Sequence, residues 1–290
     1  MSAMAKHLVV GIDGSSASAA AAVWAGEEAA AVGADVLLLN VWQPPTGDTQ
    51  VSPTPDILRL CEEEQLRVAA AKLIARNPRL DVGMEQVTGT PATALVDAAT
   101  AGDEIVLGSR RLGRIAGYLY GSVGLHVVAH SDCPVVLVRA PGSRPGGAGA
   151  GVVLALDLDR PSEALTAFAF EEASARGAAL RVVYVWDVRG LYGYGGPMTD
   201  RQEAARMRHE RGRELALFIE PWRAAFADVE VTADVVAGPV TDCLVKAGQD
   251  CALLVAGRRR RHLPVGVRIG PVTHAVVHHA PCPVAVVPHD

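Results

Sequence analysis

The chain of 290 residues contains the same succession of segments twice. Leu8–Asp13 corresponds to Val152–Asp157, because each is a short apolar run that ends in aspartate and leads into an Ala-rich stretch. Further landmarks recur in the same order: Val36–Trp42 with Leu180–Trp186, Gly89–Pro91 with Gly238–Pro239, Ile105–Gly108 with Leu253–Gly257, and Cys133–Val138 with Cys282–Val287. This self-similarity predicts two copies of one domain, so each candidate site should occur twice.

A segment rich in glycine and proline separates the two copies. It covers residues 140–150, reads APGSRPGGAGA and has no apolar period, which is typical of a linker. We therefore expect a first domain over residues 1–140, a linker over 141–150 and a second domain over 151–290. Each copy then has an ordinary domain length of roughly 100–200 residues.

Composition excludes several classes of protein. The net charge of −5 argues against a general nucleic-acid binder, which is usually strongly basic. No apolar stretch approaches the roughly 18 residues of a membrane helix, and we expect no signal peptide. The odd number of cysteines suits reduced thiols, so we expect a cytoplasmic protein. Heavy use of alanine and arginine is typical of a high-GC bacterium.

Short Val- and Leu-rich runs alternate with helical stretches in each copy. In the first copy we expect strands near residues 7–12, 35–41, 82–87, 104–108 and 134–138. The runs are nearly continuous in apolar residues, so both faces of the sheet should be covered by helices. This pattern predicts the α/β class, with two doubly wound five-stranded parallel sheets.

Local signals place the helices. The first should begin at Ser15 or Ser16, whose hydroxyl can cap free amides, and end before Gly33. Thr90-Pro91 predicts another helix start, with threonine as the cap. The remaining helices are expected over about 56–76, on the spacing of Ile57, Leu60, Cys61, Val68 and Ile74, and after Gly121-Ser122.

Ligands of doubly wound sheets bind beyond the carboxyl ends of the strands, where the winding direction reverses. In the first copy that rule points to Asp13–Ser15, Val41–Trp42 and the loop Gly108–Gly124. The loop contains several glycines and ends at a helix start, a combination that suits phosphate. A flexible loop with glycines for turns is the equal alternative. Neither a P-loop nor the G-x-G-x-x-G fingerprint is present.

These residues resemble the universal stress protein family, and the resemblance covers both copies. The family carries G-x2-G-x9-G-[S/T] after its fourth strand, an aspartate after its first strand and a valine at the end of its second. The first copy matches with Asp13, Val41, Gly108, Gly121 and Ser122. The resemblance implies a sheet of the nucleotide-alpha-hydrolase, Rossmann-like type. It also implies ATP on the glycine loop, with adenine near Asp13 and Val41, while magnesium is left open.

The resemblance implies a set of cofactor-binding residues in each copy. In the first copy they are Gly11, Asp13, Gly14, Ser15, Val41, Gly108, Arg110, Arg111, Gly121, Ser122 and Val123. In the second copy they are Asp157, Val185, Gly257, Gly270 and Thr273.

The chain departs from the family motif at its second glycine, where it has Arg111 in the first copy and Arg260 in the second. Such an arginine either folds over a phosphate as a clamp or fills the space that ATP needs. The second copy departs further: Pro271 lacks a backbone N–H, and Asp159 brings a carboxylate near the expected anion. We therefore expect the nucleotide mainly in the first domain.

Other constellations have ordinary explanations. His126 and His130 lie four residues apart, as do His274 and His278, but no third metal ligand accompanies them. The sequence offers no Ser-His-Asp order and no paired carboxylate that would make Asp13 part of a catalytic site. One tryptophan follows the second strand in each copy, Trp42 in the first and Trp186 in the second. Each of them either lines the mouth of a pocket or packs in the core.

Three functions remain open. The first is a non-catalytic, ATP-binding stress-response regulator; the second is a slow ATP hydrolase or adenylyl-transfer enzyme; the third is a scaffold with decayed pockets. The resemblance implies that the fifth strands, Val135–Val138 and Val284–Val287, pair the two domains within the chain. A homodimer is a further alternative.

Overall fold

The computed structural model describes residues 6–44, 54–100, 102–111, 118–119, 122–139, 150–186, 201–260 and 269–290, with only the backbone for residues 110–111, 118–119 and 201–204. The chain divides into two compact units, Met1–Ser143 and Arg144–Asp290. Of the expected linker, only Ala150 lies within the described residues. The exact domain boundaries therefore stay a prediction.

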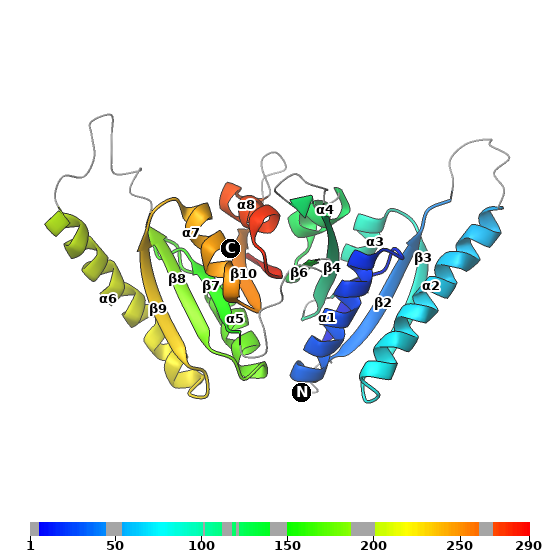
Figure 1. The fold of residues 1–290 in the computed structure, drawn as a ribbon, viewed down its shortest axis with the longest axis horizontal. Coiled ribbons are helices and arrows are strands. Elements are labelled where there is room, and N and C mark those ends of the chain that lie inside the picture. The colour runs from blue at the N-terminus through cyan, green and yellow to red at the C-terminus, as the bar shows by residue number, and fades with distance from the viewer. Residues whose placement is uncertain are drawn as a thin grey trace. The chain divides into compact units, whose positions relative to one another are not determined.

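The first unit alternates strands and helices. Its elements are β1 (His7–Gly11), α1 (Ser16–Val32), β2 (Asp35–Trp42), α2 (Pro55–Arg76), β3 (Val82–Thr88), α3 (Pro91–Ala98), β4 (Glu104–Arg111), β5 (Tyr118–Leu119), α4 (Ser122–His130) and β6 (Val135–Arg139). The strands pair in the order β3-β2-β1-β4-β6, all parallel, while β5 pairs antiparallel with β4 (Figure 1).

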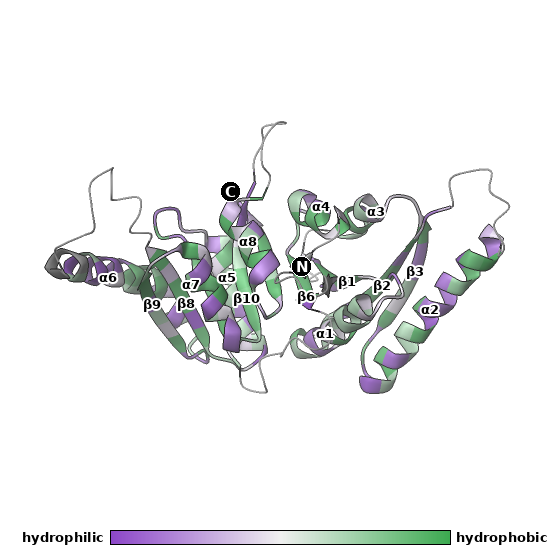
Figure 2. Cartoon of the chain, turned by 45° about the horizontal axis from the view of Figure 1, so that its top comes forward, coloured by the Kyte–Doolittle hydropathy of each residue, from purple (hydrophilic) through white to green (hydrophobic). Residues whose placement is uncertain are grey.

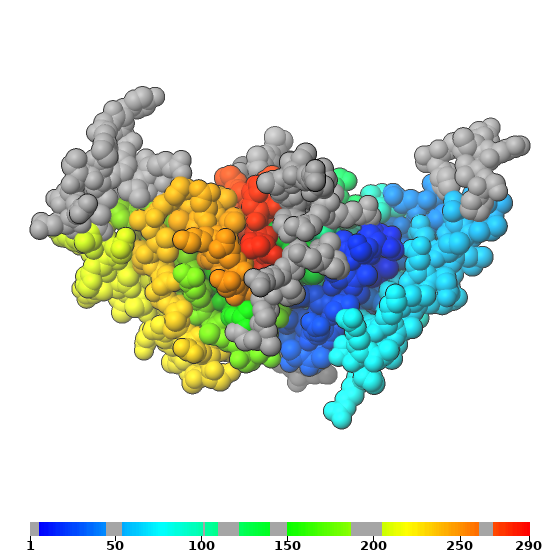
Figure 3. Space-filling model, viewed as in Figure 1, coloured from blue at the N-terminus to red at the C-terminus, as the bar shows by residue number. Residues whose placement is uncertain are grey.

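Helices cover both faces of this sheet. Helix α1 contacts α2, and α3 contacts α4, so the helices form two pairs. Figure 3 shows α1 and α2 side by side on the surface of the first unit. The strand order reverses between β1 and β4, which is the signature of a doubly wound sheet. The predicted α/β class is confirmed.

The second unit repeats this architecture. Its elements are β7 (Val152–Leu156), α5 (Glu163–Ala175), β8 (Leu180–Trp186), α6 (Arg201–Ala225), β9 (Val231–Ala237), α7 (Val240–Ala247), the 3₁₀ turn η2 (Gly248–Asp250), β10 (Leu253–Arg259), α8 (Pro271–His279) and β11 (Val284–His289). Its parallel order, β11-β10-β7-β8-β9, matches that of the first unit. None of the helices that the structure describes is long and apolar enough to cross a bilayer.

The predicted start and end of the first helix are confirmed. Ser15 is the N-cap of α1, and its Oγ accepts a hydrogen bond from the N–H of Ser18 at 3.2 Å. Gly33 ends the helix in the left-handed conformation, with φ of 69°. Helix α3 begins at Pro91 as expected, but the side chain of Thr90 makes no capping hydrogen bond.

Helix α2 forms where it was predicted, but the apolar residues on which the prediction rested do not face the core. Its core side is made by three buried residues, Leu66, Ala70 and Leu73. The residues on which the prediction rested are exposed, with fractions of 49% for Ile57, 55% for Leu60, 41% for Val68 and 43% for Ile74. Figure 2 accordingly shows hydrophobic residues between the polar ones along α2. Helical spacing was the correct signal, but it did not identify the buried face.

Strand β4 is longer than predicted. It continues beyond Gly108 to Arg111, because Arg110 and Arg111 pair with Leu119 and Tyr118 of β5. The first residues of the expected glycine loop are therefore strand. Residues 112–117 of that loop, with residues 120 and 121, lie outside the described residues.

Candidate functional site

A cavity of about 640 Å³ lies in the first unit at the carboxyl ends of β1, β2 and β4. This is the point where the strand order reverses, and its volume is ordinary for a ligand site, roughly 300–1,000 Å³. The predicted residues that line it are Gly11, Asp13, Val41, Gly108, Ser122 and Val123.

Asp13 forms the turn between β1 and α1. Its Oδ1 accepts hydrogen bonds from the N–H of Ser15, at 3.0 Å, and from the hydroxyl of Ser15, at 2.5 Å. The same serine caps α1, so its hydroxyl serves the turn and the helix together. Ser15 therefore holds Asp13 in place beside the cavity, while Asp13 itself lines it.

Three glycines of the predicted site meet close neighbours within the protein. A Cβ on Gly108 would overlap the backbone of Ala17, so glycine here lets β4 pack against the start of α1. A Cβ on Gly11 would lie 2.9 Å from Cδ2 of Leu107. Gly14 has φ of 73°, and a Cβ there would overlap Gln65. Packing within the protein thus explains these three glycines. Gly14 is not among the described residues that line the cavity.

Asn40 organises the floor of the cavity. It is buried, and its side-chain NH₂ donates to the carbonyl oxygen of Ile12 at 3.0 Å. Its side-chain oxygen accepts from the NH₂ group of Gln86 at 2.9 Å. Both ends of the Asn40 amide are therefore used to tie β2 to β1 and β3.

The first turn of α4 forms one wall of the cavity. Ser122, Val123 and Gly124 all line the cavity there. The free amides and the dipole at a helix N-terminus favour an anion. Gly121 lies outside the described residues, as do the side chains of Arg110 and Arg111. Both predicted roles of Arg111, contact with a phosphate or occupation of the space that ATP needs, therefore stay predictions.

The cavity also contains residues that the sequence did not indicate. The most informative is Glu62 of α2, which adds a second carboxylate to that of Asp13. The others are Ile12, Ser18, Leu39, Asn40, Gln43, Pro91, Leu95 and Leu107. Leu39 and Asn40 immediately precede Val41, so their strand position was a usable signal, whereas the sequence alone does not place α2 over this edge.

A second cavity, of about 570 Å³, lies at the same place in the second unit. All the residues predicted for this copy line it, namely Asp157, Val185, Gly257, Gly270 and Thr273. Pro271 and Asp159 line it as well, so two of the three departures from the family motif in this copy face the cavity. Both tryptophans are buried, but Trp186 lines this cavity, whereas Trp42 is not among the lining residues of the first one.

An ion pair lies beside the second cavity. Arg211 of α6 approaches Asp159 with an N–O distance of 2.9 Å, and it also donates to Glu214 at 2.9 Å. Its guanidinium carbon lies 5.7 Å from the centre of the Tyr184 ring. Burial raises the pKa of Tyr184; the charge of Arg211 opposes this, and those of Asp159 and Asp157 add to it.

The end of the second cavity at the start of α8 differs from the corresponding end of the first cavity at α4. The hydroxyl of Thr273 donates to the carbonyl oxygen of Gly257 at 2.7 Å. A Cβ on Gly257 would meet the ring of His289, with Nε2 at 2.6 Å, rather than helix backbone. Arg260 does not line the cavity, and its guanidinium lies 3.9 Å from the carboxylate of Asp290.

Each histidine pair lies on the last helix of its unit, α4 in the first and α8 in the second. The rings of His126 and His130 stack, with centroids 4.0 Å apart, and those of His274 and His278 lie 4.4 Å apart. Within the part of the chain that the structure describes, no three or more His, Cys, Asp or Glu side chains gather as metal ligands would.

Comparison with known proteins agrees with this architecture. The model of the universal stress protein family matches residues 4–139 and again 151–288. A universal stress protein of Mycobacterium tuberculosis is 31% identical over 288 residues, covering 96% of each chain. One of Mycolicibacterium smegmatis is 30% identical over 288 residues, covering 97% of this chain and 96% of its own.

Solved structures show the same fold. A universal stress protein from Archaeoglobus fulgidus has a TM-score of 0.73 at 20% identity, covering 98% of both chains. A shorter universal stress protein, solved in complex with cAMP, is 29% identical over 47% of this chain, with a TM-score of 0.37. On the two family matches and the full-length relatives, the chain belongs to the universal stress protein family.

Proposed function

We propose that this protein binds ATP in the cavity of the first unit and acts as a non-catalytic, nucleotide-dependent regulator in the stress response. One observation carries the proposal: Asp13 and Val41 meet the first turn of α4 around a space of about 640 Å³. A helix N-terminus at one wall suits phosphates. The apolar residues of β2 at the other suit a base. Family membership supports the role in stress.

Magnesium fits this proposal. Asp13 and Glu62 both line the cavity, so an unaccompanied triphosphate would meet two carboxylates. A Mg²⁺ ion bound to phosphate oxygens reduces that repulsion, and carboxylates and water are its preferred ligands. We therefore propose that ATP binds together with Mg²⁺.

A regulator is preferred to a hydrolase because of what Asp13 does in the turn. Its carboxylate accepts two hydrogen bonds from Ser15, which fits a positioning role better than that of a general base. Steady release of ADP that disappears in Asp13→Ala would instead support the enzyme.

Calorimetry tests the proposal. Wild-type protein titrated with ATP and Mg²⁺ should release heat of binding, and Gly121→Val should abolish it, because the family motif has glycine at this position. Gly212→Ala is the control, because its Cβ meets nothing within 4 Å and Gly212 lies outside the cavity. The absence of heat with wild-type protein at millimolar ATP would refute the proposal. Arg111→Gly separates the two roles of that arginine. Weaker ATP binding indicates that Arg111 contacts a phosphate, and tighter ATP binding indicates that it occupies the space that ATP needs.

We also propose that the domains pair through their fifth strands, β6 and β11. Each is a valine-rich strand at one edge of the sheet of its own unit. Such edges have free N–H and C=O groups that invite pairing. Hydrogen exchange tests this: the β6 amides that are not bonded to β4 should exchange slowly. Rapid exchange of those amides would contradict the pairing.

A further inference from the structure

Tyr184 occupies the position in β8 that Asn40 occupies in β2, yet the two side chains are used differently. Both ends of the Asn40 amide bond to protein groups, Ile12 and Gln86. Tyr184 is 5% exposed and lines the second cavity, and its hydroxyl has no hydrogen-bond partner among the described residues. The hydroxyl of a tyrosine whose ring is buried usually finds a partner. This one is available to a molecule in the cavity.

The surroundings keep the Tyr184 hydroxyl protonated. Burial raises the pKa of Tyr184, and the carboxylates of Asp159 and Asp157 raise it further, although the guanidinium of Arg211 opposes them. The group is therefore a hydrogen-bond donor at neutral pH. A donor at the cavity wall calls for a ligand with an acceptor oxygen.

Two arginines line the same cavity, the exposed Arg160 and the half-buried Arg259. No carboxylate of the described residues forms an ion pair with Arg259. His289 lies beside Arg259 on the neighbouring strand, in register, and also lines the cavity. An unpaired guanidinium at the end of a cavity selects an anionic oxygen.

Two features disfavour a triphosphate here. Pro271 begins α8, so the first helical residue has no N–H to offer. The hydroxyl of Thr273 is already bonded to Gly257. The loss of these two hydrogen-bond donors at the start of α8 suits a ligand with one anionic group rather than a polyanion.

We propose that the cavity of the second unit binds a small aromatic molecule with a single anionic group, a carboxylate or a monophosphate. Arg259 pairs with the anion and Tyr184 donates to one of its oxygens. The flat body of the ligand packs against the apolar part of the lining, which includes Trp186, Val185 and Leu244. This site is separate from the one proposed for ATP.

Calorimetry on the full chain tests this site with benzoate and phenyl phosphate as the two probes. At least one should bind, and the stronger of the two identifies the anionic group. Tyr184→Phe keeps the ring and removes one hydrogen bond, so it should weaken binding about five- to tenfold. Arg259→Gln should weaken it about tenfold or more. Arg206→Gln, which removes the same charge from an exposed site on α6, should bind like the wild type.

The outcome is independent of ATP binding in the first unit. If ATP gives no heat but the probes bind and respond to both variants, the ATP proposal fails and this one stands. Three results would overturn it: no binding of either probe at millimolar concentration, unchanged binding in the Tyr184 and Arg259 variants, or complete displacement of the probe by ATP. Thermal melting of each variant verifies that it is folded.

Discussion

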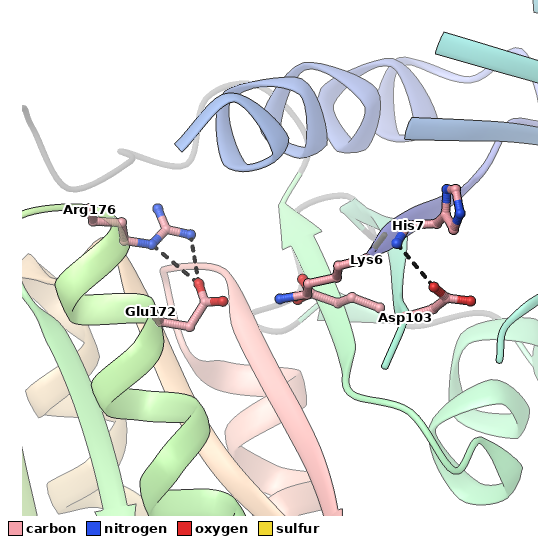
Figure 4. Close-up of polar contacts among 6 residues, drawn as sticks. Lys6, His7, Asp103, Glu172 and Arg176 are labelled. Atoms are coloured by element: carbon pink, nitrogen blue, oxygen red, sulfur yellow. Dashed lines mark hydrogen bonds and ion pairs between the residues drawn. The ribbon is translucent and has the colours of Figure 1, made fainter. Parts of the chain in front are cut away.

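The carboxylate of Asp103 accepts a hydrogen bond from the backbone N–H of His7, with an N–O distance of 3.0 Å (Figure 4). Its second oxygen accepts from the N–H and the hydroxyl of Thr100, each at 2.7 Å. Asp103 directly precedes β4, and His7 begins β1. The side chain therefore joins the two strands between which the winding direction reverses, at the end opposite the first cavity.

Replacing Asp103 should destabilise the protein in a pH-dependent way. Burial raises the pKa of Asp103, but the hydrogen bonds from Thr100 and His7 outweigh burial and hold it below the ordinary value. Its stabilisation is therefore present above the unfolded-state pKa of about 3.9 and is lost as pH falls through the lowered folded-state value. We expect Asp103→Asn to cost about 1–3 kcal/mol at pH 7. Urea unfolding at pH 7 and pH 3.5 checks this, and an equal loss at both would contradict it.

Gly108→Ala should destabilise the first unit even without ligand. The new Cβ would overlap the backbone of Ala17, so β4 and α1 must separate, at a cost of about 1–3 kcal/mol. In Gly257→Ala the Cβ meets the ring of His289, which can turn aside, so the loss should be smaller. Gly212→Ala should stabilise by up to about 1 kcal/mol. Chemical denaturation ranks the three, and equal losses for Gly108 and Gly257 would refute this packing argument.

Two leucines of α2 should respond differently to the same substitution. Leu66 is 3% exposed, so Leu66→Ala should cost about 2–5 kcal/mol. Leu60 is 55% exposed, so Leu60→Ala should change stability by no more than about 0.5 kcal/mol. The pair needs no other control, since the side chain removed is identical. A large loss at Leu60 would mean that a partner covers this face.

The thiols should differ sharply in reactivity. Cys61 is exposed, whereas Cys251 and Cys282 are buried with their sulfurs 3.2 Å apart. The hydrogen bond with Cys282, together with burial, raises the pKa of Cys251, which makes its thiolate rare. Brief treatment of native protein with iodoacetamide should label Cys61 and leave the other two intact. Peptide mass spectrometry reads this directly, and labelling of Cys251 before unfolding would contradict the structure.

Local signals predicted the element boundaries well where the chain itself supplies the cap. Ser15 and Gly33 define α1, and Pro91 begins α3, because these residues act through their own backbone conformation and hydrogen bonds. The repeat also located the second cavity, since Asp157 and Gly257 line it as Asp13 and Gly108 line the first. Position along a strand was enough for these residues.

Contacts between elements determine the rest. Strand β4 extends to Arg111 because Tyr118 and Leu119, a few residues later in the chain, pair with it. Glu62 reaches the cavity because α2 packs over β2 and β3, which no local pattern reveals. For the same reason, Leu60 and Leu66 look alike in the sequence and differ in burial.

Native mass spectrometry of the full chain with ATP and Mg²⁺ tests the central claim most directly, because it counts the nucleotides on each chain. We expect one ATP per chain, lost in Gly121→Val and retained in Arg259→Gln. A chain that stays empty, or one that keeps its nucleotide in Gly121→Val, would contradict the assignment of ATP to the first unit.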